Sequence, residues 1–199
     1  MKIHFMLRFH SELILKSTTM IIRDAAEADL PAIVEIYNST IACRLVTADI
    51  EHISVESRLS WFHSHTADRR PLWVIEPTIN QQMECNTLEE GANCEIAGWL
   101  GFQSFYSARK AYDKTAELSI YISLNYRRQG VGRILLQAAI ARSPALGIKN
   151  LVGCIFANNE PSLTLFKNFG FEQWGYLPAI AEFEGGTSDL VILGLHLSS

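Results

Sequence analysis

The residues best suited to chemistry in this chain form a glycine- and arginine-rich segment, Arg127-Arg128-Gln129-Gly130-Val131-Gly132-Arg133. Residues 118–123 before it have the composition of a buried strand, and residues 133–142 after it are rich in strong helix formers. A glycine turn between a strand and a helix directs backbone N–H groups and the positive end of the helix dipole at one point. The pattern predicts a phosphate site, in which Gly130 and Gly132 keep side chains away from a pyrophosphate.

Two nucleotide-binding motifs have similar glycine spacing, but neither matches this segment. A Rossmann fingerprint requires a third glycine near position 135, where this chain has Leu135. A P-loop requires lysine and then serine or threonine after its last glycine, whereas Gly132 is followed by Arg133 and Ile134. A tight turn without a ligand is the alternative interpretation of the glycines alone.

A second segment, residues 159–171, has helix signals at both ends. Pro161 suits the start of a helix, and Gly170 suits the left-handed residue after its last turn. Asn159 stands where its side chain can cap this helix, bind a ligand, or do both.

The two segments together resemble the GNAT superfamily of N-acetyltransferases, whose Arg-x-x-Gly-x-Gly loop binds the pyrophosphate of acetyl-CoA. The resemblance implies that residues 127–133 bind acetyl-CoA and that Asn159 contacts its pantetheine arm. It also implies that backbone groups of Ile120, Tyr121 and Ile122 pair with that arm as an added strand would. The Tyr121 side chain should point to the face opposite Ile120 and Ile122, into the core.

Three further segments resemble the phosphinothricin/methionine sulfoximine acetyltransferase branch of this superfamily. They are residues 22–30, residues 108–117, and Gly185-Gly186 with Asp189, so the resemblance covers roughly residues 21–197. It implies that Glu117 is the general base that removes a proton from the acceptor amine. Partial desolvation at the start of the cofactor strand would raise the pKa of Glu117 and make it a better base. The alternative is a surface carboxylate at a strand end.

The acceptor side departs from the pattern of this branch. Arg109 and Tyr112 precede Glu117, and Arg109 is either a clamp for a substrate carboxylate or a solvated side chain. Phe183 stands in the segment where the relatives carry lysine and aromatic side chains, so phosphinothricin itself is in doubt as the acceptor. Phe166 occupies the position of the tyrosine that protonates the leaving thiolate in many GNAT enzymes.

The function expected from the resemblance is acetyl-CoA-dependent N-acetylation of a small primary amine or amino-acid-like substrate. A protein or peptide N-acetyltransferase and a non-enzymatic acyl-CoA-binding module are the alternatives. The resemblance also suggests a homodimer.

Composition narrows the class of protein further. The chain has 199 residues, enough for one domain, and its net charge of −4 argues against an electrostatically held nucleic acid. No apolar run approaches the length needed to span a membrane, and charged residues interrupt any signal peptide, so a cytoplasmic location is expected. We expect residues 1–19 to be an extension or an over-called start and residues 20–199 to be a single domain.

The cysteine and histidine spacing does not suggest a structural site. The four cysteines lack a Cys-x-x-Cys motif and are expected to be free thiols, with a Cys85–Cys94 pair as the alternative. No metal site is expected, because His63-Ser64-His65 lacks suitable carboxylate or thiolate partners and has the character of a solvated helix end.

Hydrophobic periodicity predicts alternating strands and helices, as in an α/β protein. The resemblance implies the GNAT fold, in which a central mixed sheet has helices on both faces. The expected helices are 29–37 with Asp29 as N-cap, 55–63, 133–142 and 161–169, and residues 77–94 are expected to form a long acidic loop. The expected strands are 20–23, 72–75, 96–102, 118–123, 151–156, 171–175 and 190–197.

Overall fold

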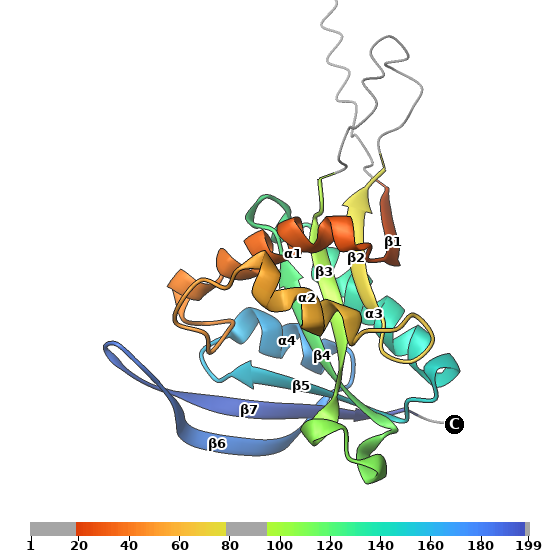
Figure 1. Ribbon diagram of the computed structural model, residues 1–199. Helices are drawn as coiled ribbons and strands as arrows, with labels where there is room; N and C mark the ends of the chain where they lie inside the picture. The colour runs from red at the N-terminus through yellow and green to blue at the C-terminus, as the bar shows by residue number, and fades with distance from the viewer. Residues whose placement is uncertain (1–18, 79–94, 198–199) are drawn as a thin grey trace, which may run out of the picture.

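One mixed sheet organises the chain in the computed structural model, which describes residues 19–78 and 95–197. Its strands follow the order β1-β2-β3-β4-β5-β7-β6, and β4–β5 is the parallel pair among antiparallel neighbours (Figure 1). The expectations for residues 1–18, for the loop over 79–94 and for a Cys85–Cys94 pair lie outside the described residues. The strands are β1 (Met20–Asp24), β2 (Leu72–Pro77), β3 (Gly98–Ser104), β4 (Thr115–Ile122), β5 (Asn150–Phe156), β6 (Glu172–Phe183) and β7 (Gly186–His196).

Helices cover both faces of the sheet, which confirms the predicted α/β architecture. Helices α1 (Leu30–Asn38) and α2 (Val55–His63) lie on one face, and α3 (Val131–Arg142) and α4 (Glu160–Asn168) lie on the other (Figure 1). Short 3-10 helices occupy the connections. They are η1 (Glu27–Asp29), η2 (Ile41–Cys43), η3 (Phe105–Ala108), η4 (Lys110–Tyr112), η5 (Leu124–Tyr126) and η6 (Ser143–Leu146).

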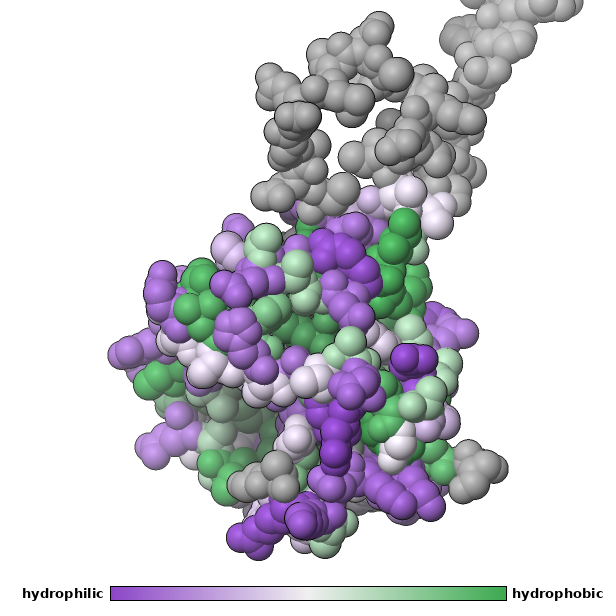
Figure 2. Space-filling model, turned by 45° about the vertical axis from the view of Figure 1, so that its right-hand side comes forward, coloured by the Kyte–Doolittle hydropathy of each residue, from purple (hydrophilic) through white to green (hydrophobic). Residues whose placement is uncertain are grey.

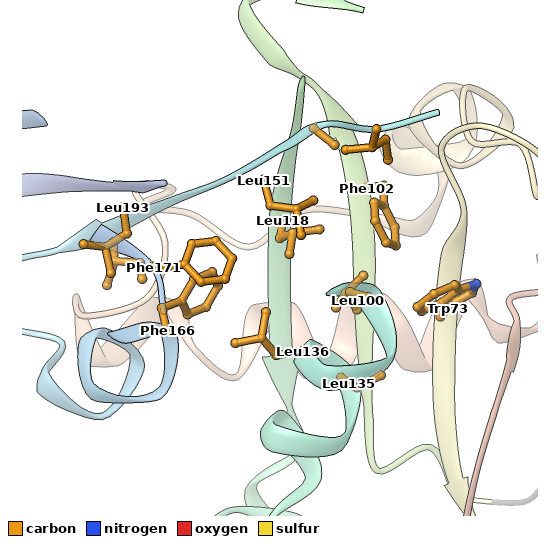
Figure 3. Close-up of a cluster of buried hydrophobic side chains, with 14 of the residues drawn as sticks. Trp73, Leu100, Phe102, Leu118, Leu135, Leu136, Leu151, Phe166, Phe171 and Leu193 are labelled. Atoms are coloured by element: carbon orange, nitrogen blue, oxygen red, sulfur yellow. The ribbon is translucent and has the colours of Figure 1, made fainter. Parts of the chain in front are cut away.

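Apolar residues at helical spacing attach these helices to the sheet. Helix α3 buries Leu135 and Leu136 against sheet residues such as Leu100 and Leu118 (Figure 3). Burying one such side chain contributes about 1.5–3 kcal/mol. On the face shown in Figure 2, hydrophilic side chains are interspersed with apolar patches. In the described part of the chain, no helix has the length and apolar character needed to cross a membrane.

The parallel strands β4 and β5 separate after a short stretch of pairing. Their ladder joins Thr115, Ala116 and Glu117 to residues 150–152, although β4 continues to Ile122 and β5 to Phe156. Beyond Glu117, β4 has no strand partner on the β5 side among the described residues, although the Ile122 carbonyl accepts a hydrogen bond from Arg127 Nε at 3.5 Å. The other backbone groups on this side need a partner from elsewhere. The sheet thus opens at its centre.

Some predicted boundaries were wrong, and two of these errors affect the site. Strand β4 begins at Thr115, so Glu117 lies inside the strand rather than at its start. Strand β6 continues to Phe183 instead of ending at Gly175, so Phe183 lies near the tip of a β-hairpin. Asp29 is the N-cap residue of α1, as predicted, but its carboxylate makes no capping bond because it binds Arg23 at 2.6 Å.

Candidate active site

The loop before α3 has the geometry of an anion site. Gly130 is the N-cap of α3 with φ 83°, a left-handed conformation that favours glycine. The first helical hydrogen bond runs from the Ile134 N–H to the Gly130 carbonyl at 3.0 Å. The N–H groups of Val131, Gly132 and Arg133 precede it and have no carbonyl one turn earlier within the helix. Together with the helix dipole they attract an anion.

The second glycine and the arginines of this loop have distinct surroundings. A Cβ on Gly132 would lie 3.3 Å from Leu165, so the glycine also lets α3 approach α4 closely. Arg127 and Arg128 are exposed, and Arg128 adopts a positive φ of 61°. The Arg133 guanidinium lies 5.3 Å from the centre of the Phe169 ring. Positive charge thus surrounds the start of α3.

Asn159 is buried and caps α4, because its side-chain oxygen accepts a hydrogen bond from the Ser162 N–H at 3.3 Å. The cap uses only the oxygen of the amide, so the amide nitrogen can serve as a donor to a ligand. Phe166, further along α4, is buried beside Phe171 (Figure 3). Its ring packs so close to β5 that a Cβ on Gly153 would lie 2.6 Å from it. Phe166 is therefore a core residue.

The side chains of β4 divide between the two faces of the sheet. Ile120 and Ile122 pack on the cluster under α3 and α4, whereas Tyr121 packs on the cluster under α1 and α2. Tyr121 stacks on Trp99 with ring centres 4.4 Å apart, which confirms its predicted orientation into the core. Glu117 and Ser119 share the Tyr121 face because side chains alternate along a strand.

Burial raises the pKa of the Glu117 carboxyl, as expected from the sequence. A hydrogen bond from the Cys154 thiol acts in the opposite direction but does not cancel the effect of burial. Burial and the neighbouring Glu117 carboxylate raise the pKa of the Cys154 thiol to about 12, so the thiol keeps its proton near neutral pH. Glu117 is therefore a partly desolvated carboxylate beside the opening between β4 and β5.

A pocket of about 300 Å³ extends from this region between the sheet and helices α1 and α2. Its walls include four aromatic side chains and the guanidinium of Arg58. Gln103 and Ser119 line it as well; Gln103 pairs with Glu117 across the sheet, and Ser119 is two residues further along β4. The aromatic side chains are Tyr37, Trp61, Trp99 and Tyr121.

The residues predicted to bind the acceptor are distributed over two places. Arg109 and Tyr112 lie in the connection before β4, where both are exposed and the Arg109 guanidinium is 5.6 Å from the Tyr106 ring centre. Phe183 lies near the tip of the β6–β7 hairpin, which is at another end of the molecule (Figure 1). Its ring packs on that of Phe156, with ring centres 5.6 Å apart. The structure does not bring these three residues into one cluster.

The chain matches the family model described as "Acetyltransferase (GNAT) family" over residues 48–171. The chain belongs to this family. It is thus a GNAT N-acetyltransferase, and its α/β sheet with paired helices on each face is the fold of similar solved structures.

Several relatives of this GNAT enzyme carry names that specify a substrate. It is 48% identical over 90% of its length to the whole of "Putative phosphinothricin acetyltransferase YwnH" from Bacillus subtilis. It is 28% identical, over 88% of its length and 94% of the relative, to the "L-methionine sulfoximine/L-methionine sulfone acetyltransferase" of Pseudomonas aeruginosa.

Two solved structures are similar over most of the GNAT enzyme's length. The crystal structure of a "putative phosphinothricin N-acetyltransferase" matches with a TM-score of 0.79 and 46% identity, covering 91% of this chain and 100% of that one. A phosphinothricin acetyltransferase from Sinorhizobium meliloti in complex with AcCoA matches with a TM-score of 0.76 and 26% identity, covering 90% and 89%.

Sequence reasoning missed the aromatic pocket of this GNAT enzyme. The signal was present in β3, where Trp99 and Gln103 have even spacing, and in α2, where Arg58 and Trp61 are three residues apart. The prediction for His63-Ser64-His65 was half right. His63 ends α2 in solvent, but His65 is partly buried and its Nδ1 lies 2.8 Å from the Trp61 carbonyl oxygen.

Proposed function

We propose that this GNAT enzyme uses acetyl-CoA to acetylate the primary amine of a small, amino-acid-like acceptor, with Glu117 as the general base. The complex of a relative with AcCoA supports the donor, and the substrates in the relatives' names support the acceptor class. The observation that carries the proposal is the partly buried Glu117 carboxylate beside the point where β4 and β5 separate.

Two parts of the chain would hold acetyl-CoA, which supplies the acetyl thioester. The N–H groups at the start of α3 and the side chains of Arg127, Arg128, Gln129 and Arg133 would bind the pyrophosphate. The free edge of β4 at Ile120, Tyr121 and Ile122 would pair with the pantetheine arm, and the Asn159 amide nitrogen would donate a hydrogen bond to it.

The chemical step needs a neutral amine, since a protonated amine has no lone pair. The ammonium form first loses a proton to Glu117, which releases it to solvent. The nitrogen then bonds to the acetyl carbon, the carbon–sulfur bond breaks, and Glu117 takes the second proton that the nitrogen loses as the amide forms. An N–H near Ile122 stabilises the developing oxyanion, and one such donor is typically worth about 3 kcal/mol of barrier. Phe166 has no proton to give, so CoA leaves as the thiolate. The pKa of a thiol, roughly 8.5, makes the thiolate a sufficiently good leaving group without an acid.

The pocket favours a small acceptor over a peptide. Its volume of about 300 Å³ lies at the lower end of the range for small-molecule sites. Arg109 and Tyr112 precede β4 and would approach the acceptor carboxylate from the side away from the pocket. Phe183, on the β6–β7 hairpin, would contact the acceptor from the direction of β5.

CoA release measured against amino acids, polyamines and peptides tests this proposal. We expect release with small amino acids and its near-complete loss in Glu117→Gln. Release with peptides alone would overturn the acceptor class. Binding of acetyl-CoA without release on any acceptor would instead identify an acyl-CoA-binding module.

A homodimer is part of the proposal and rests on the exposed apolar side chains of the edge strand β6. Trp174, Tyr176 and Ile180 are 41%, 47% and 59% exposed on this strand. Long apolar edge strands usually pair or are covered. Sedimentation velocity of the full chain distinguishes a dimer from a monomer.

A further inference from the structure

The pocket between α1, α2 and the sheet has an aromatic interior and a polar end close to Glu117. Trp61 lies edge-on to Trp99 with ring centres 5.7 Å apart, and Tyr37 lies 5.0 Å from Tyr121. These contacts involve four elements, because Tyr37 comes from α1, Trp61 from α2, and Trp99 and Tyr121 from the adjacent strands β3 and β4. The interaction energy of two aromatic rings is most favourable when they meet edge-to-face or in an offset stack.

The wall that Arg58 forms is held in place by several contacts. The Arg58 guanidinium lies 5.2 Å from the Tyr37 ring centre and 5.7 Å from that of Trp61, and it pairs with Asp49 at 3.3 Å. The Tyr37 hydroxyl donates to the same carboxylate at 2.6 Å. Arg58 thus presents a planar cation against aromatic faces, which is a surface on which a further ring can stack.

The other end of the pocket is polar. Ser119 is two residues from Glu117 on the same face of β4, a separation of about 6.6 Å along a strand. Gln103 lies opposite Glu117 in the β3–β4 ladder, so their Cβ atoms are about 5 Å apart. Both Ser119 and Gln103 line the pocket. An amine at Glu117 would therefore have its substituent directed between Ser119 and Gln103 into the aromatic interior.

We propose that the acceptor is a primary amine that carries an aromatic ring, with the ring in this pocket and the amine at Glu117. The inference rests on the proposed function and specifies its substrate class. Of the ten described residues that line the pocket, Arg58 alone carries a charge, so the pocket offers little to the highly polar head group of phosphinothricin or methionine sulfoximine. Since Arg58 already pairs with Asp49, such a group would exchange its hydration for few polar partners, whereas a ring would meet four aromatic side chains.

Filling the pocket tests the inference. Ile53 lines it at the segment before α2, and Ile50 in the same segment is 60% exposed and lies outside the lining. We expect the wild-type chain to acetylate L-phenylalanine or 2-phenylethylamine with a kcat/KM at least about tenfold above that for L-alanine or L-methionine sulfoximine. Ile53→Trp should remove this preference by lowering kcat/KM for the aromatic acceptors, whereas Ile50→Trp should preserve the preference and keep kcat/KM for L-alanine within about threefold. The two aromatic acceptors distinguish an amino acid from a simple arylalkylamine.

Calorimetric binding of 2-phenylethylamine and L-phenylalanine in the presence of CoA separates this inference from the proposed function. The enzyme could acetylate L-alanine or L-methionine sulfoximine as well as aromatic acceptors, with no effect specific to Ile53→Trp. This result would overturn the inference and leave the proposed function standing. A different result is that no acceptor releases CoA, while 2-phenylethylamine or L-phenylalanine binds to the wild type and not to Ile53→Trp. This result would overturn the proposed function and support aromatic binding in the pocket. Absence of aromatic binding to the wild-type chain would overturn the inference directly.

Discussion

Gln103 on β3 lies directly opposite Glu117 on β4, and its side-chain amide contacts His65. The Nδ1 of His65 lies 2.8 Å from the Trp61 carbonyl oxygen, which can only accept a hydrogen bond, so Nδ1 carries the proton. The Nε2 atom then accepts from the Gln103 amide nitrogen at 3.3 Å, and burial lowers the pKa of His65, which keeps it neutral. His65 therefore orients the Gln103 amide beside the proposed base.

Replacing the proposed base should separate turnover from cofactor binding. Glu117→Gln keeps the shape of the side chain but cannot take a proton, so we expect turnover to fall about 10²–10⁴-fold. Acetyl-CoA affinity should stay within about twofold, because the pyrophosphate loop is untouched. Steady-state CoA release and calorimetry measure the two quantities. Glu172→Gln, an exposed carboxylate on β6, is the control. Unchanged turnover would remove Glu117 from the mechanism.

The pH dependence of kcat/KM should reveal the Glu117–Cys154 contact. A base acts when ionised, and burial raises the pKa of Glu117, so activity should rise with pH at a higher pH than for an ordinary glutamate. The hydrogen bond from the Cys154 thiol lowers the pKa of Glu117. In Cys154→Ala the rise of kcat/KM with pH should therefore occur at still higher pH. Cys154→Ser keeps a donor and should stay near the wild type. All variants are measured with the same acceptor, so the titration of its amine contributes equally to each pH profile. A rise in activity at lower pH in Cys154→Ala than in the wild type would contradict the assignment.

The parts of the site that are local in sequence could be predicted, and the parts assembled from distant elements could not. The turn at Gly130 and the cap at Asn159 depend on neighbouring residues, so their types and spacing are sufficient. The pocket joins Tyr37, Trp61 and Trp99 through the packing of two helices on a sheet. Each of these residues alone is an ordinary core aromatic.

The same distinction explains the errors in the fold. Helix α2 was predicted at its observed bounds, because Ser54 caps it through the Ser57 N–H and its apolar residues recur at helical spacing. Strand β6 was predicted too short, because Gly175 and Pro178 are strand-breaking residues. They are tolerated here because β6 is an edge strand with two irregularities in its register. Tertiary pairing with β7 outweighed local preference.

The left-handed glycine at the start of α3 should matter for both stability and cofactor binding. Gly130 has φ 83° and Gly147 has φ 72°, and a Cβ added at either position would meet no atom within 4 Å, so alanine costs only backbone strain at each. We expect both alanine variants to lower the free energy of unfolding by about 1–2 kcal/mol. Gly130→Ala alone should weaken acetyl-CoA binding, because relaxing its φ moves the N–H groups that follow. Urea unfolding and calorimetry measure these effects; equal affinities in the two variants would place the pyrophosphate elsewhere.

The ion pair between Arg23 and Asp29 should make stability depend on pH in the acid range. Burial opposes ionisation of Asp29, but hydrogen bonds from Arg23 and the Ala26 N–H, with the Arg23 charge, outweigh it and lower the pKa of Asp29. A carboxyl whose pKa is lower in the folded state stabilises the fold above its unfolded pKa of about 3.9, and this contribution is lost as pH falls below that value.

Asp29→Asn should therefore lower the free energy of unfolding at pH 7 by about 1–3 kcal/mol, with a difference from the wild type that shrinks as the pH approaches 3. Urea unfolding at several pH values measures it. Glu27→Gln is the matched control, because the Glu27 side chain is 61% exposed, against 13% for Asp29, and pairs with His63 at 3.4 Å on the surface. Its effect should stay within about 0.5 kcal/mol. A pH-independent loss in Asp29→Asn would mean that packing, rather than charge, is what the Asp29 carboxylate contributes.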